Sequence, residues 1–131
     1  MIRRDNFLLI PSALLLESPP SMDQWESMGS YLLSMQRSLY WWIGDMLVNG
    51  ESQLGDDIYQ AFDPSFSVPL IERCAAVSRA FPLGHRNTNL SWTHHQALLG
   101  FSEPIQRTAL RKAEIEGWDT AQFKRYLQEI R

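Results

Sequence analysis

Apolar side chains recur every three or four residues through one long stretch of the first half of the chain. Its members are Trp25, Met28, Leu32, Met35, Leu39, Trp42 and Met46. This spacing places them on one face of a helix, so the pattern predicts a long helix over about residues 21–48. Asn49 and Gly50 supply the expected stop signal.

Two roles are open for this helical face. Further apolar residues widen it, which favours a central helix covered by the rest of its own domain; these are Leu33, Tyr40, Ile43 and Leu47. The same heptad spacing also suits a dimer seam. The seam residues would be Trp25, Met28, Leu32, Met35 and Leu39, and we expect a homodimer built from this face and the N-terminal arm.

Residues 1–21 form that arm. Short apolar runs alternate there with Pro11, Pro19 and Pro20, which predicts one or two short strands or an extended segment rather than a helix. Its leucines need burial, either in the chain's own core or against a second copy. We therefore divide the chain into an arm over 1–21 and one helical domain over 22–131.

Residues 51–81 have helix-turn-helix proportions. A short helix over 51–62 and a turn at 63–66 precede a helix over 67–80, which Ser67 caps and in which Pro69 occupies the first turn. Further N-caps are predicted at Ser91, Ser102 and Asp119, and Gly117 ends the helix before the last one. The fold class is mostly α, with a helix-turn-helix core, a long central helix and a short extended or β arm.

Composition fits one soluble domain of 131 residues, with 44% apolar and 21% charged side chains. The single cysteine, Cys74, excludes an internal disulfide and suits a cytoplasmic protein. The apolar runs at 7–10 and 13–16 are too short to span a bilayer. The net charge is −3, but residues 1–71 carry three basic against nine acidic side chains, whereas residues 72–131 carry nine basic against six acidic side chains. That asymmetry can orient a protein on a polyanion.

In the helix-turn-helix interpretation the second helix enters the major groove of double-stranded DNA. Six residues lie near its leading end: Ser65, Ser67, Val68, Pro69, Glu72 and Arg73. Ser67 and the helix-start N–H groups suit a phosphate, and the planar fork of Arg73 suits guanine. Backbone contacts are expected from Arg79, Arg86, Arg107 and Arg111. The alternative is an ordinary helical hairpin, because helix pairs of this length are common.

Other chemistry is weakly represented. His94 and His95 are adjacent and point about 100° apart on a helix, so they do not form a metal site; we expect one in the core and the other exposed. Trp42 is expected in the core, and Trp41, although more open, at a contact between elements. We expect no cofactor, no metal and no enzymatic activity.

Two resemblances add to these expectations. The segment Leu90-Ser91-Trp92-Thr93-His94-His95-Gln96-Ala97-Leu98-Leu99, with the helices up to Glu116-Gly117-Trp118, resembles the region that follows the recognition helix in ParB/KorB-type partition proteins. It covers about a quarter of the chain. The arginine-rich nucleotide-binding motif of that family is absent, so its CTPase activity is not carried over.

The second resemblance covers most of residues 25–127. Trp42-Ile43-Gly44-Asp45, Asn49-Gly50-Glu51 and the 90–95 segment look like small bacterial and phage proteins related to the LmbU-like regulators of antibiotic gene clusters. The resemblances imply a recognition helix containing Ser67 to Arg73, braced by the helix of Ser91 and His94. The expected function is sequence-specific DNA binding in transcriptional control, of bacterial, phage or plasmid origin. The alternative is a protein-interaction module, such as a small phage-encoded inhibitor of a host protein.

Overall fold

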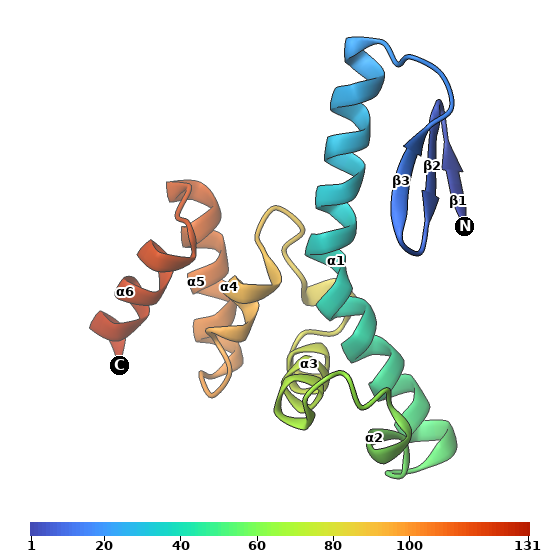
Figure 1. Ribbon diagram of the computed structural model, residues 1–131. Coiled ribbons are helices and arrows are strands. Elements are labelled where there is room, and N and C mark those ends of the chain that lie inside the picture. Colours follow the sequence, from blue (N-terminus) through green and yellow to red (C-terminus); the bar gives the residue numbers. More distant parts are fainter. The chain divides into compact units, whose positions relative to one another are not determined.

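A computed structural model describes residues 1–131 and shows a mostly helical chain with a small N-terminal sheet (Figure 1). The strands are β1 (Ile2–Arg4), β2 (Phe7–Ile10) and β3 (Ala13–Leu16). The helices are α1 (Met22–Leu54), α2 (Ile58–Ala61), α3 (Val68–Ala80), α4 (Trp92–Gln96), α5 (Glu103–Glu116) and α6 (Thr120–Ile130), with a 3-10 turn at Leu83–His85. The predicted mostly α class, with a long central helix and a short β arm, is confirmed, and the helix-turn-helix core stays a prediction.

The chain divides into two compact units, residues 1–37 and 38–131, and the long helix α1 contributes to both. The predicted boundary after residue 21 stays a prediction. None of the helices combines the length and the apolar character needed to cross a membrane.

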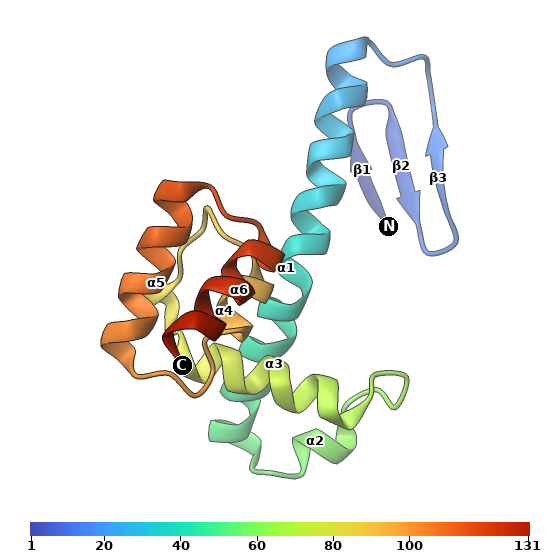
Figure 2. The same cartoon turned by 90° about the vertical axis from the view of Figure 1, so that its left-hand side faces the viewer.

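The N-terminal unit is an antiparallel meander in the order β1-β2-β3, lying along the first half of α1 (Figure 2). Arg4 fastens β1 to the helix: its guanidinium donates to the Ser27 hydroxyl at 3.3 Å and lies 4.4 Å from the Tyr31 ring centre. Only two large apolar side chains of this unit are buried, Phe7 and Met28. The predicted β arm is confirmed, with three strands rather than one or two.

The C-terminal unit holds the main core. Its buried side chains come from the second half of α1, from α3 to α6 and from the segments between them. The largest of those less than 2% exposed are Phe123, Leu47, Ile71, Leu98 and His95. The four predicted N-caps are in place: Ser67, Ser91, Ser102 and Asp119. Gly117 ends α5 with a φ of 67°, a left-handed conformation that favours glycine.

Two predictions about α1 are wrong. The helix does not stop at Asn49-Gly50 but continues to Leu54, and it ends before Gly55, whose φ is +86°. The predicted helix over 51–62 is therefore split, and only Ile58–Ala61 forms a separate helix. Asn and Gly are unfavourable in a helix by about 1 kcal/mol at most, which the packing of neighbouring turns can offset.

The heptad face of α1 is not covered by the rest of the chain, contrary to the favoured expectation. Five of its members are exposed, at 57%, 42%, 42%, 53% and 65% for Trp25, Leu32, Leu39, Trp42 and Met46 respectively. In its second half the helix buries a different flank, through Ile43 and Leu47. Apolar periodicity alone defines a wide stripe, and here the core uses only one side of it.

Candidate nucleic-acid interface

The α2–α3 pair is joined by a tight, hydrogen-bonded turn over residues 62–67. The Asp63 carboxylate accepts from the Ser65 backbone N–H at 2.8 Å, and the Asp63 carbonyl accepts from Phe66 N–H at 3.1 Å. The bonds from Ser65 hold the pKa of Asp63 below its ordinary value. These bonds set the direction in which the chain enters α3.

The leading end of α3 is open to solvent. Ser67 caps it, accepting from Leu70 N–H at 3.3 Å, and Pro69 follows within the first turn. Val68 is 54% exposed, and Glu72 and Arg73 are exposed one turn further along. Arg73 takes part in no ion pair, so its guanidinium is available to an external acceptor.

The opposite side of α3 is fixed in the core. Ile71, Cys74 and Val77 are at most 1% exposed, and burial raises the pKa of the Cys74 thiol. Against this side, Gly44 of α1 meets α3 so closely that a Cβ built on it would lie 2.3 Å from the Cys74 carbonyl oxygen and 2.3 Å from Ser78 Oγ. The close crossing of α1 and α3 at Gly44 therefore holds α3 with its polar side outward.

Arg79 ties the last turn of α3 to its neighbours. It donates to the Tyr59 hydroxyl at 2.7 Å and forms an ion pair with Glu51, and Tyr59 in turn donates to Glu51 at 3.1 Å. The bonds to Tyr59 and Glu51 raise the pKa of Arg79. The predicted phosphate contact of Arg79 thus competes with a cluster that joins α1, α2 and α3.

Arg86 lies inside the unit, with only 13% of its side chain exposed. It makes two bonds to Asp45, at 2.9 and 2.7 Å, donates to the Phe81 carbonyl at 2.7 Å and lies 4.2 Å from the Trp41 ring centre. The Arg86 hydrogen bonds hold the pKa of Asp45 below its ordinary value. Trp41 is half-buried at this contact between elements, as expected, whereas Trp42 is exposed, so its expected place in the core is wrong.

Both histidines of α4 are buried, so the expectation that one would be exposed is wrong. His94 Nδ1 accepts from Ser91 N–H at 3.2 Å, which leaves Nε2 to donate to the Trp118 carbonyl at 2.9 Å. His95 Nε2 accepts from Asn87 N–H at 3.1 Å and Nδ1 donates to the Ser91 carbonyl at 2.8 Å. Burial lowers the pKa of His95, which favours its neutral form. Through these bonds the two rings hold α4 to the 87–91 segment and to Trp118, just before α6.

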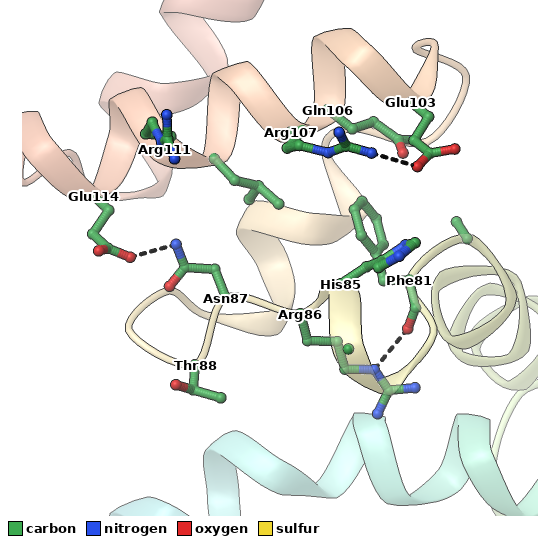
Figure 3. A pocket seen from close by; sticks show the side chains of 13 residues that line it. Phe81, His85, Arg86, Asn87, Thr88, Glu103, Gln106, Arg107, Arg111 and Glu114 are labelled. Atoms are coloured by element: carbon green, nitrogen blue, oxygen red, sulfur yellow. Dashed lines mark hydrogen bonds and ion pairs between the residues drawn. The ribbon is translucent and has the colours of Figure 1, made fainter.

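A groove of about 420 Å³ lies between the 81–88 segment and α5 (Figure 3). Arg107 and Arg111 project from α5 along it. Arg107 is paired with Glu103 at 2.7 Å, and both side chains are well exposed, so this pair is easily exchanged for another partner. Arg111 takes part in no ion pair.

Comparison with known proteins adds one relative. Over 109 residues the chain is 28% identical to transcriptional regulator NovE from Streptomyces niveus. The match covers 82% of this chain and 50% of the relative, so the chain spans about half the length of that protein. No protein-family model and no solved structure matches the chain. The resemblance to LmbU-like and ParB-type proteins therefore stays a prediction.

The predicted site residues divide into two groups. Ser65, Ser67, Val68, Pro69, Glu72 and Arg73 gather at or near the exposed start of α3, and Arg107 and Arg111 lie along the groove. Arg79 and Arg86 are engaged inside the fold. The sequence did not reveal that Arg79 binds Glu51 and Tyr59, or that Arg86 binds Asp45. These partners are 20 to 41 residues apart along the chain, and no local pattern indicates them.

Proposed function

We propose that the protein is a sequence-specific DNA-binding regulator of transcription that acts by binding and not by chemical turnover. The observation that carries the proposal is the leading end of α3, which is exposed and capped on one side and buried on the other. A helix held in this way can enter the major groove without rearrangement of its domain. The similarity to transcriptional regulator NovE supports the same conclusion.

Each exposed residue at this end has a role that suits DNA. Ser65 and Ser67, with the free N–H groups of the first turn, bind a phosphate. Arg73 donates two bonds to guanine, and Val68 contacts a thymine methyl group. Glu72 accepts from cytosine and repels a misplaced phosphate, which adds specificity at some cost in affinity.

Contacts to the DNA backbone come from Arg107 and Arg111 along the groove in this proposal. Arg86 is enclosed and makes no contact with DNA, and Arg79 holds α3 in place. Pseudo-palindromic sites are read by two-fold symmetric proteins, so we also propose a homodimer. Of the predicted seam residues, Trp25, Leu32 and Leu39 are exposed, Met35 is half-buried, and Met28 is only 4% exposed and so inaccessible to a partner.

The test uses matched arginine variants in a fluorescence anisotropy assay on duplex DNA. Wild-type affinity should fall steeply with salt, by about 0.9 logarithmic units per logarithmic unit of salt for each phosphate contacted. Arg111→Ala should lower the affinity for all duplexes by the same factor. Arg73→Ala should reduce the ratio between the affinity for the preferred sequence and the affinity for random sequence. Arg37→Ala, an exposed arginine of the other unit, is the control. Equal loss with all three variants would refute the assigned roles.

A further inference from the structure

The N-terminal unit exposes more large apolar side chains than it buries. Leu14, Leu15 and Leu16 of β3 are 42%, 46% and 53% exposed, and Trp25 and Leu32 of α1 are similarly open. The unit has 37 residues and its cysteine-free sequence holds no disulfide. Units below about 40 residues usually need a staple or a partner to be stable. The exposed apolar side chains of so small a unit therefore indicate that a binding partner covers them.

The two edges of the sheet differ in a way that identifies the docking edge. The strand order makes β1 and β3 the edges. β1 carries Arg3 and Arg4, and charged side chains are a common protection of an edge against pairing. β3 reads Ala-Leu-Leu-Leu, without charge or proline. The β3 edge is therefore open to another strand and the β1 edge is protected.

The hydrogen-bond register of the sheet shows which backbone groups are free. Glu17 N–H donates to the Asn6 carbonyl at 2.8 Å, and Leu8 lies opposite Leu15. Hydrogen-bonded and non-bonded pairs alternate along an antiparallel ladder. Leu15 thus bonds to β2, whereas the N–H and C=O groups of Leu14 and Leu16 point away from it, toward the free edge.

We propose that a second copy of this chain docks here, with the two β3 strands pairing antiparallel about a two-fold axis at Leu15. Identical strands paired antiparallel are self-complementary, as an isologous interface requires. In this register Leu14 of one copy bonds with Leu16 of the other, and the reverse, giving about four backbone hydrogen bonds. The result is one continuous six-stranded sheet, β1-β2-β3-β3-β2-β1.

The side chains agree with this occupant. Leu14 and Leu16 share the sheet face of Phe7, the buried residue that contacts Trp25 of α1, so both leucines lie beside the helix face of their own copy. Leu15 points to the opposite face of the sheet, so the side chains gathered on the Phe7 face are Leu14, Leu16 and Trp25. Their exposed area is on the order of 300 Å² per chain, set against about 800 Å² per partner in a standard interface. The contact is smaller than a standard interface, so the paired backbones of the two β3 strands carry a large share of it. This inference deepens the homodimer of the proposed function by naming the strand that forms it.

Sedimentation equilibrium of the full chain tests the pairing. The wild type should sediment as a dimer. Leu15→Lys sets two like charges opposite each other and should raise the dimer dissociation constant more than about tenfold, whereas Leu83→Lys, at a still more exposed leucine of the other unit, should not. Leu14→Pro removes an N–H that does not bond to β2, so the fold and its far-ultraviolet circular dichroism should stay unchanged. Because that N–H bonds to the second copy in the proposed dimer, Leu14→Pro should raise the dissociation constant of the dimer more than Leu14→Ala does.

Disulfide trapping locates the axis. Non-bonded antiparallel pairs have Cα atoms about 4.5 Å apart, within the range that a disulfide spans. Leu15→Cys should therefore form a covalent dimer rapidly on mild oxidation, and Leu83→Cys should not; native Cys74 is buried and does not interfere. A monomeric wild type, a dimer insensitive to Leu15→Lys, or equal trapping at both cysteines would overturn the proposal. None of these measurements contains DNA, so their failure is separate from failure of the DNA-binding proposal.

Discussion

Gly44 offers the sharpest test of how α3 is held. It lies in the second half of α1, where a Cβ would come within 2.3 Å of a backbone oxygen of α3 and 2.8 Å of the adjoining carbonyl carbon. Ordinary contacts of a Cβ are 3.4–4 Å. Gly44→Ala therefore forces the two helices about 1 Å apart, since the obstructing Cys74 carbonyl belongs to the backbone and cannot rotate away, unlike the Ser78 hydroxyl.

The expected cost follows from two opposing effects. Alanine is better than glycine in a helix by about 1 kcal/mol. Overpacking of a tight contact costs about 1–3 kcal/mol and occasionally more, and looser packing around Cys74 and Val77 adds to that cost. We expect Gly44→Ala to lower the free energy of unfolding by about 2 kcal/mol. For a unit of 94 residues, 38–131, this corresponds to a melting temperature lowered by about 8–16 °C.

Gly29 is the matched control because it lies in the same helix, at a point where a Cβ would meet no atom within 4 Å. Gly29→Ala should stabilise the protein by about 0.5–1 kcal/mol. Urea unfolding followed by circular dichroism measures both variants. If Gly44→Ala were as stable as Gly29→Ala, the close crossing of α1 and α3 would be wrong, and with it the reason for the direction of α3.

Three further changes test the contacts around α3. Arg86→Lys keeps the charge but loses the two-pronged bond to Asp45, so we expect it to cost about 1–2 kcal/mol in urea unfolding. Because the pKa of Asp45 is lowered in the fold, the stabilisation from this pair is present at neutral pH and is lost as pH falls below 3.8; a cost unchanged in strong acid would contradict the pairing. Burial lowers the pKa of His95 from 6.5, so the unfolded chain binds the proton first and stability should fall as pH drops below that value and level off above it. His95→Gln should flatten this slope, and an unaltered slope would assign it to another group. Ser67→Ala removes the cap of α3 and should cost about 1 kcal/mol, whereas an equal loss from Ser65→Ala would point to the turn instead of the cap.

Local signals in the sequence predicted most of the helical boundaries. Capping residues act within one turn of the chain, so Ser67, Ser91 and Asp119 are recognisable without knowledge of the fold. The arm was also predictable, because its prolines exclude a helix. Gly50 misled the prediction of where α1 ends, since a glycine inside a helix costs little once neighbouring turns are packed.

Tertiary pairing was not predictable in the same way. Nothing in the sequence links Asp45 or Glu51 to a partner, yet each holds an arginine from far along the chain. Arg79 and Arg86 therefore looked like free cations for DNA. The apolar stripe on α1 gave the helix correctly but not its buried side, because periodicity cannot distinguish a core flank from one reserved for a partner.

The most direct test of the central claim is selection of bound fragments from random duplex DNA by the wild type and by Arg73→Ala. The exposed end of α3 should enrich a defined motif with the wild type, and Arg73→Ala should lose the preference at a guanine while other positions persist. Enrichment of no motif by the wild type, or of an identical motif by both proteins, would contradict the assignment of α3 as the helix that reads DNA.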